Sequence, residues 1–385
     1  MANTLTNLIP DVYSALDVVS REMVGFIPAV MRDTTAERAA VNQVVRSFVA
    51  PAVTAGNITP GVTPPDDGDQ TFANKTVTIT KARRVPFRWN GEQTRGVNNG
   101  GPGARSMQAA QIEQAIRTLT NEMEADLAGL HIYASRAHGS VATPFASDLS
   151  DTANVLKIMK DNGAPPTGMS LIIDTTAGAK MRTLTQLTKA NEANDASMLR
   201  QGVLLDVHGF AIRESGQIAT HTKGTGASAT TDNAGYAVGA TTITLASAGT
   251  GTIVAGDIVT FTGDTNQYVV ATGDTDVSNG GTIVLAAPGL RKALAASAIN
   301  ITLIASCARN MAFTRNAIVL ATRAPALPDG GDSAVDRTLV TDPRSGMTFE
   351  LAMYAQYRQM QYEISAAWGV AAMKTEHMAL LLGLA

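Results

Sequence analysis

The chain has 385 residues, a formal net charge of −3, and a composition that is 45% hydrophobic but only 16% charged. This length allows two or three domains with a substantial core, and the near-neutral charge excludes a protein that binds nucleic acid through a generally basic surface. Because an average globular protein is roughly 25% charged, we expect something other than a dense charged surface to cover much of this chain.

Cysteine content and hydropathy exclude further classes. The single cysteine, Cys307, excludes a disulfide framework and a zinc site built on several thiolates. The first basic residue is Arg21, so a secretory signal is not predicted, and charged residues and Pro28 interrupt the apolar stretch 12–30. We therefore expect a chain made in the cytoplasm that does not span a membrane.

The N-terminal region predicts two helices. Pro10 and Asp11 favour a helix start, and apolar residues at helical spacing continue it to Met23. A second, short helix is predicted over 36–45. Little sequence surrounds these elements to cover their apolar faces. They are expected either to pack on their own domain or to form an arm on a neighbouring molecule.

A long hairpin is predicted next. Residues 50–69 are rich in proline and end in an acidic turn at Asp66, Asp67 and Asp69, which we interpret as a solvated turn rather than a calcium loop. Alternating strand patterns follow over 76–80 and 85–89. A two-stranded hairpin is not stable alone in water, so we expect it to lie on this subunit or on another.

One basic cluster lies on the predicted second strand, at Lys81, Arg83, Arg84 and Arg88. Interleaved aromatic residues would suit single-stranded nucleic acid. The acidic tip on the same hairpin favours the alternative, in which acidic and basic residues pair between copies of the chain.

The most informative element is a long helix predicted from Met107 to Ala137, about 31 residues or roughly 46 Å. Its apolar stripe comprises Ile112, Ile116, Leu119, Met123, Leu127, Leu130 and Ala134. A rod of this length suits a flat or elongated subunit. The glycines that precede it, Gly100, Gly101 and Gly103, lack a full phosphate-loop pattern and predict a hinge or connector.

An α/β region follows, and a β-rich block interrupts it. A helix over 151–161, a strand over 170–173, a helix capped by Asp174 and a strand over 210–212 are predicted. From 224 to 290 there is no Lys, Arg or Glu. Strands in and just after this block are predicted at 241–245, 258–261, 268–271, 282–285 and 299–304, as in a small barrel or sandwich. After Cys307 the chain regains its charged residues, with strand patterns over 347–353 and from Trp368.

No catalytic constellation is present in the sequence. The five histidines do not form the zinc-protease pattern, and neither a nucleophile elbow nor a phosphate loop occurs. We therefore expect no enzymatic activity, no catalytic residue, no cofactor and no metal site.

The order of these parts resembles the HK97-like fold of tailed-phage major capsid proteins. The inserted block, with the run from Val254 to Phe261 and the return over 310–323, is similar to the insertion domain of the P-twenty-two-type coat proteins of short-tailed phages. The resemblance implies an α+β fold whose parts are an N-terminal arm (1–45), an extended hairpin loop (46–98), a peripheral domain with a spine helix (99–148), a first axial part (149–220), an inserted β-barrel (221–305) and a second axial and peripheral part (306–385).

The resemblance further implies a coat protein that self-assembles, as hexamers and pentamers, into the icosahedral shell enclosing the phage genome. Because only about 45 residues precede the hairpin, a separate scaffolding protein is expected, with a portal at one vertex, a decoration protein and packaged double-stranded DNA as further neighbours. The protein would be located in the virion and assembled in the host bacterial cytoplasm. The alternatives are an encapsulin-like nanocompartment shell and an enzyme with a β-rich accessory domain.

Overall fold

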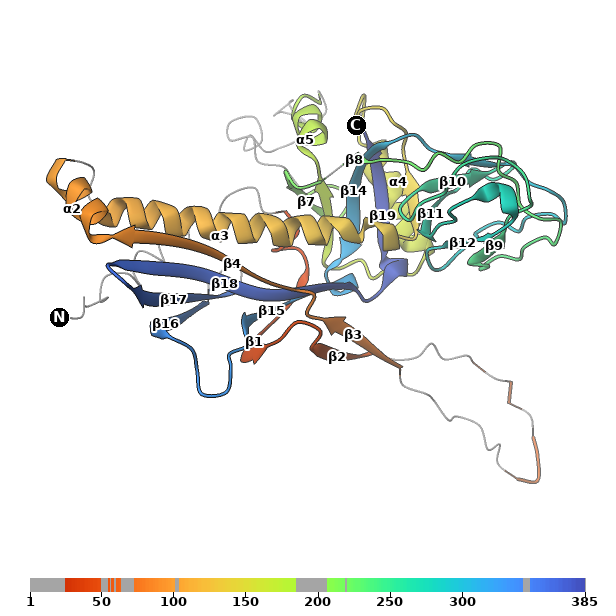
Figure 1. Cartoon of the computed structure of the whole chain (residues 1–385). Helices are drawn as coiled ribbons and strands as arrows, with labels where there is room; N and C mark the ends of the chain where they lie inside the picture. The colour runs from red at the N-terminus through yellow and green to blue at the C-terminus, as the bar shows by residue number, and fades with distance from the viewer. Residues whose placement is uncertain are drawn as a thin grey trace.

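The computed structural model describes residues 25–49, 55, 57–58, 60–63, 73–100, 104–184, 206–218, 220–341 and 347–384. The helix predicted from Pro10 therefore lies outside the described residues, as do the acidic turn at Asp66, Asp67 and Asp69 and the two glycines Gly101 and Gly103. The described chain is elongated, with a long helix and a sheet at one end and a second, larger sheet at the other (Figure 1).

The first layer is a six-stranded sheet. Its strands are β1 (Met31–Ala39), β15 (Ile318–Pro325), β18 (Gln359–Ala372), β17 (Thr348–Gln356) and β16 (Ala334–Thr341) in that order, with β4 (Lys81–Asn90) also paired to β18. The alternating pattern from Met347 to Met353 is confirmed, because these apolar side chains are all buried. The strand containing Trp368 begins earlier than predicted, since β18 starts at Gln359.

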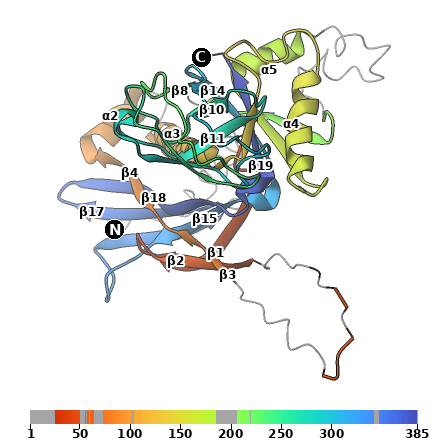
Figure 2. The same ribbon diagram turned by 90° about the vertical axis from the view of Figure 1, so that its right-hand side faces the viewer.

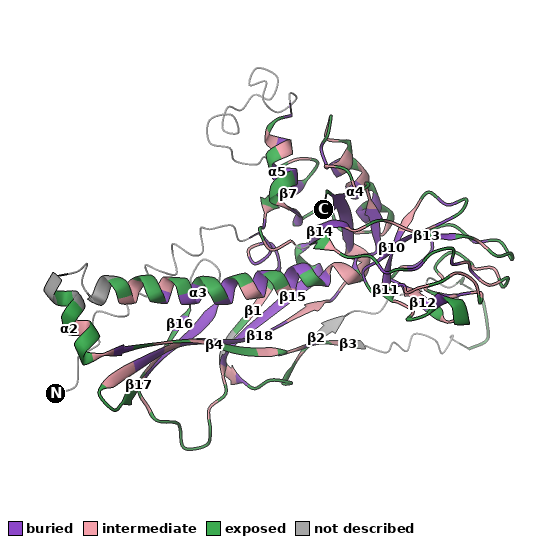
Figure 3. Cartoon of the chain, turned by 45° about the horizontal axis from the view of Figure 1, so that its top comes forward, coloured by how far each residue is buried: buried purple, intermediate pink, exposed green. Residues whose placement is uncertain are grey.

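Helix α3 (Ala104–Ala128) lies along this sheet and contacts β4 and β18 (Figure 3). All seven residues of the predicted apolar stripe are buried. The predicted length was wrong: the α-helix ends at Ala128, a 3-10 turn η1 (Gly129–Tyr133) follows, and β5 (Arg136–His138) is a strand. Pairing of β5 with β11 and β19, both distant in sequence, overrides the local helical pattern. Helix α2 (Gly91–Gly100) precedes α3.

The second layer is an eleven-stranded sheet. Its main path is β13 (Ile301–Leu303), β10 (Ile258–Phe261), β11 (Gln267–Thr272), β5, β19 (Met378–Gly383), β14 (Cys307–Thr314), β6 (Met169–Ile173) and β7 (Phe210–Glu214), with β8 (Thr220–His221), β9 (Thr242–Thr244) and β12 (Thr282–Leu285) attached. Helices α4 (Ser150–Asp161) and α5 (Thr175–Arg182) flank it (Figure 2). The other short 3-10 turns are η2 (Val277–Asn279), η3 (Arg315–Ala317) and η4 (Thr375–His377).

The predicted strands of the inserted block are present as β9 to β13, and they enclose a separate core that includes Ile243, Phe261 and Tyr268. The block is not detached from the rest of the chain. Its strand β11 pairs with β5, so the block continues the eleven-stranded sheet.

The predictions for the hairpin region were partly wrong. The stretch 36–45 is not a helix: β1 runs parallel to β15, and β2 (Val44–Val49) pairs with β3 (Ala73–Thr78) as a separate two-stranded sheet. The β-branched valines of this stretch suit strands, and the pairing partners lie far away in sequence. The basic strand β4 is not part of the projecting hairpin, because it pairs with β18 over its whole length.

Candidate functional site

The root of the β2–β3 hairpin is fixed firmly to the six-stranded sheet. Val77 and Ile79 are buried in a small apolar cluster with residues of β15 and β18. The amide of Thr80 donates to the carbonyl of Trp368 at 3.0 Å, and Lys75 Nζ donates to the carbonyl of Met373. Apolar packing and these two hydrogen bonds therefore set the direction in which the hairpin leaves the sheet.

Gly369 makes this close crossing possible. A Cβ atom at this position would lie 1.9 Å from the carbonyl oxygen of Thr78, far inside any real contact. Only glycine lets the chain entering β4 cross β18 at this distance. The sequence Trp-Gly-Val gave no local sign of this role, because the neighbour is distant in the chain.

Beyond the root, the described residues expose apolar side chains. Ile58 is 98% exposed and Val62 is fully exposed, so the described part of the chain does not cover them. Val41 and Val44 are also exposed at the near end of the hairpin. At the end of strands β17 and β18, Tyr357 is 90% exposed on the turn that joins them. Large apolar groups left open on projecting segments are typical of surfaces that another molecule covers.

The basic residues of β4 have partners within their own chain. Lys81 Nζ lies 3.0 Å from Glu122 Oε1 and 2.8 Å from Asp126 Oδ1 on α3, and Arg83 Nε lies 3.2 Å from the same Glu122 oxygen. Burial lowers the pKa of Lys81, but the hydrogen bonds and charges of the two carboxylates outweigh it and raise that pKa above its usual 10.5. These pairs fasten β4 to the long helix.

The other two cations of the cluster, Arg84 and Arg88, contact β18. Arg84 Nη1 lies 2.7 Å from Glu363 Oε2, and Arg88 Nε donates to Gln361 Oε1 at 2.9 Å. The side chains of Arg83 and Arg84 are 58% and 62% exposed, so both remain accessible to a second carboxylate. Their role between subunits stays a prediction.

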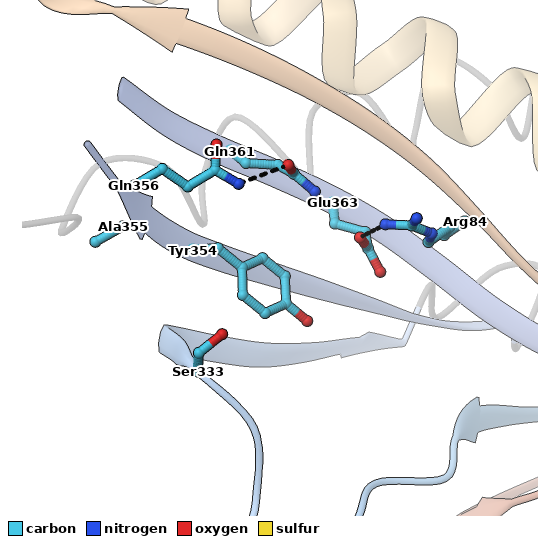
Figure 4. A pocket seen from close by; sticks show the side chains of 7 residues that line it. All are labelled: Arg84, Ser333, Tyr354, Ala355, Gln356, Gln361 and Glu363. Atoms are coloured by element: carbon cyan, nitrogen blue, oxygen red, sulfur yellow. Dashed lines mark hydrogen bonds and ion pairs between the residues drawn. The ribbon is translucent and has the colours of Figure 1, made fainter. Parts of the chain in front are cut away.

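Arg84 also lines a hollow of about 380 Å³ on the six-stranded sheet. Figure 4 shows Arg84 directed toward Glu363 and Gln356 directed toward Gln361, with the ring of Tyr354 between them and Ser333. The Tyr354 hydroxyl donates to Asp332 at 2.9 Å. The full lining comprises Arg84, Ser333, Tyr354, Ala355, Gln356, Gln361 and Glu363. Such a polar, partly charged hollow can accept hydrogen-bonding groups from another chain.

The predicted hinge adjoins a helix that was not predicted from the sequence. Gly100 is the last residue of α2, and α3 begins at Ala104. The amide of Gln93 donates to Asn90 Oδ1 at 2.7 Å, and the amide of Asn90 donates back to Gln93 Oε1 at 3.2 Å. This reciprocal capping box, with Asn and Gln three residues apart, was the available signal for a helix start.

A buried carboxylate holds the beginning of the described chain. Glu124 on α3 is 1% exposed and accepts hydrogen bonds from the amides of Phe26 (3.1 Å) and Ile27 (2.7 Å) and from the Ser215 hydroxyl (3.0 Å). Burial raises the pKa of Glu124, whereas these hydrogen bonds lower it, and the net direction is upward. Sequence reasoning missed this anchor, since a glutamate on a helix usually faces solvent.

The described residues include no group of three or more His, Cys, Asp or Glu side chains placed to hold a metal ion. Cys307 is fully buried, and burial raises the pKa of its thiol. None of the helices in the described part of the chain is long and apolar enough to cross a membrane.

Comparison with known proteins gives likenesses of fold only. No family model matches the sequence, and no curated protein matches it. Among solved structures, the chain is similar to the capsid of the cyanophage P-SCSP1u, with 11% identity, 93% of this chain and 87% of that chain covered, and a TM-score of 0.48. It is also similar to the capsid of a native GTA particle (9% identity, 95% and 91% covered, TM-score 0.47).

A third similar structure is a virus-like particle from Pyrococcus furiosus, with 9% identity, 98% of this chain and all of that chain covered, and a TM-score of 0.45. Because all three TM-scores are below 0.5, these likenesses carry no argument about what the chain does.

Proposed function

We propose that this chain is the major capsid protein of a tailed bacteriophage and that it assembles into the icosahedral shell around the genome. One observation carries the proposal: a hairpin fixed at its root exposes Ile58 and Val62 almost completely. Full exposure of such side chains is unfavourable in water by about 1.5–3 kcal/mol each relative to burial. Neighbouring copies that cover these groups would recover this free energy at every contact.

The elongated shape supports a lattice subunit. Helix α3 and the six-stranded sheet form an elongated unit beside the eleven-stranded sheet (Figure 1). This arrangement supports an HK97-like fold with a spine helix and with peripheral and axial domains. The segment boundaries predicted from the sequence, including the arm over 1–45 and the loop over 46–98, remain part of this proposal.

The strand pairing within the inserted block supports the proposal that the block is a small barrel. Its strands pair in the order β9, β12, β11, β10 and β13. Segment 229–232 bonds to both ends of this series: the amide of Thr231 donates to Ile299 next to β13, and the amide of Asp232 donates to Thr244 in β9. We propose that this segment closes the ring, giving the small insertion barrel expected from the sequence.

For the subunit contact, we propose that the acidic turn at Asp66, Asp67 and Asp69 approaches the basic strand of a neighbouring copy. Arg83 and Arg84 are the exposed cations of that strand, and the hollow beside Arg84 gives a carboxylate room to enter. Lys81 and Arg88 extend the positive charge along β4. Because Arg84 already pairs with Glu363, the neighbour's carboxylate would share the guanidinium.

The wider proposal includes hexamers and pentamers of the chain, a separate scaffolding protein, a portal at one vertex and a decoration protein, with double-stranded DNA inside. Assembly would take place in the host bacterial cytoplasm and end in the virion. Gly100, the last residue of α2, is proposed as a hinge during shell expansion, together with Gly101 and Gly103, which precede α3 in the sequence. A Gly101→Pro, Gly103→Pro double variant should trap assembly or expansion; normal particles would contradict the hinge.

Negative-stain microscopy of the expressed chain, with and without its scaffolding protein, tests the main proposal. The wild type should form closed particles, whereas Ile58→Ser with Val62→Ser should give folded, unassembled subunits. Val238→Ser, which removes an exposed apolar side chain from the inserted block, is the matched control and should still assemble. Normal particles from the hairpin variant would overturn the proposal, and particles filled with protein cargo would favour a nanocompartment.

Charge reversal tests the subunit contact. Arg83→Glu with Arg84→Glu should reduce particle yield, and adding Asp66→Lys with Asp67→Lys should restore it. Glu363→Gln is the control, because it removes the partner of Arg84 within the chain without reversing a charge. Failure of the reversed acidic residues to rescue assembly would contradict the pairing and leave the shell function standing.

A further inference from the structure

Three parts of the chain meet at a buried polar cluster. His131 lies in η1, just after the long helix; His221 and Arg309 lie on β8 and β14 of the eleven-stranded sheet; and Asp257 lies in the inserted block, just before β10. The rings of the two histidines are 5.4 Å apart, edge to face.

Asp257 is the only carboxylate that bonds within this cluster, among the residues that the structure describes, and it is fully buried. It lies 3.0 Å from His221 Nε2 and accepts from the amides of Gly224 (3.1 Å) and Val254 (2.9 Å). Arg309 donates to the carbonyl of Gly256 at 3.3 Å and to Cys307 Sγ at 2.9 Å. Residues 256 and 257 are thus held by Arg309 of β14 on one side and by His221 of β8 on the other.

Within the described chain, His131 has no acceptor for a second proton. Its Nδ1 lies 3.2 Å from the carbonyl of Ala128, so Nδ1 carries the proton of the neutral ring. Its Nε2 is buried without a hydrogen-bond partner, as is Nε of Arg309. A Cβ atom on Gly256 would lie 2.9 Å from His131 Nε2 and 2.8 Å from His221 Cε1, so the two rings leave no room for a side chain at this position of the block.

We propose that this cluster is an acid-released latch, in which neutral His131 packs the inserted block against the end of the long helix and a proton on its Nε2 loosens that contact. A proton on Nε2 would be buried without a hydrogen-bond acceptor, and its charge would lie close to those of Arg309 and of His221, which is itself ionisable. The charged and titratable groups that act on His131 are His221 and Arg309; Asp257 lies behind them on His221, and Cys307 on Arg309. This device is independent of shell assembly.

The direction of the pH effect follows from burial. Burial lowers the pKa of His131 to about 4, with the charges of His221 and Arg309 acting in the same direction, although the hydrogen bond to Ala128 opposes them. In the opened form the ring would regain its ordinary value of 6.5. The contact is therefore fully favourable above about pH 6.5 and weakens as the pH falls toward 4.

The opening should be local. On its other side the block is held by pairing of β11 with β5 and by Gln267 Nε2, which donates to the carbonyl of Gly139 at 2.9 Å. Arg136, itself buried, also donates to Asn266 at 3.0 Å. We therefore expect release at residues 224 and 254–257, with protection kept at 267–269.

Hydrogen exchange of the full-length, unassembled chain at pH 8 and pH 5, corrected for intrinsic rates, tests the latch. Two pKa values of 6.5 and about 4 predict up to about a 30-fold larger opening constant at 254–257 at pH 5. His131→Asn, which keeps a donor for Ala128, and His131→Phe, which keeps the ring volume, should both abolish this increase.

His138→Asn is the matched control, because His138 pairs with Asp151 outside the cluster and its loss should leave the increase in place. Comparing the pH dependence within each variant keeps the test valid even where a substitution lowers stability at pH 8. An unchanged opening of the wild type at pH 5, or an increase that persists in both His131 variants, would overturn the latch.

Discussion

The hairpin root offers a sharp test, because Gly369→Ala adds one methyl group at a backbone crossing. The new Cβ atom would lie 1.9 Å from the carbonyl oxygen of Thr78, whereas ordinary carbon–oxygen contacts are about 3.3 Å or longer. The crossing chains must therefore separate by roughly 1.4 Å. That movement breaks the 3.0 Å hydrogen bond from Thr80 to Trp368, at a cost of about 1 kcal/mol, and strains the packing around Ile79 by about 1–3 kcal/mol.

We therefore expect Gly369→Ala to destabilise the unassembled subunit by about 2–4 kcal/mol. The fluorescence of Trp368 during urea unfolding reports on this site, since this residue precedes Gly369 and is fully buried. Gly96→Ala in α2 is the control, because no atom lies within 4 Å of its added Cβ, and it should be neutral or slightly stabilising. An unchanged midpoint for Gly369→Ala, with normal protection of the Thr80 amide, would refute the argument that this crossing fixes the hairpin.

Three further outcomes follow from buried groups. Glu124→Ala leaves two buried backbone amides unsatisfied and should lower the free energy of unfolding, measured in urea, by about 3–5 kcal/mol. Glu124→Gln keeps one oxygen and should lower it less. If the two variants were equally stable, the hydrogen bonds of Glu124 would not be what holds residues 26 and 27. Because the folded-state pKa of Glu124 is raised, the free energy of unfolding should fall as the pH rises from about 4.5 toward that pKa, while the hydrogen bonds to the two amides remain. A pH dependence that Glu124→Gln does not flatten would contradict this. The buried Cys307 thiol, whose pKa burial raises, should react with an aromatic disulfide reagent only after unfolding; rapid labelling of the native subunit would disagree.

Local patterns predicted those elements whose stability depends mainly on their own residues. The apolar stripe of α3 is at helical spacing, and the capping oxygen of Asp174 accepts from the amides of Thr176 and Ala177, as its position before α5 predicted. The strands of the inserted block were found because turn residues separate them. Each of these signals is contained within a few consecutive residues.

The errors arose where distant segments decide the structure. The helical prediction continued over residues 129–137, but β5 gains hydrogen bonds from β11 and β19, which lie more than 100 residues away. Likewise, residues 36–39 belong to β1 and residues 44–45 to β2, because β1 pairs with β15 and β2 pairs with β3. Single-sequence patterns do not contain the position of these partners.

The basic strand illustrates the same limit for charge. In the sequence, the three aspartates of the hairpin turn are the acidic cluster on the same predicted hairpin as Lys81 to Arg88, which favours pairing between copies. In the fold, Glu122 and Asp126 reach β4 from α3, and Glu363 reaches it from β18. Since these partners lie within the subunit, any pairing between copies must add to contacts that already exist. A neighbour's carboxylate would then gain most at Arg83 and Arg84, whose side chains are more exposed than that of Lys81, the third cation of β4 with a carboxylate partner in its own subunit.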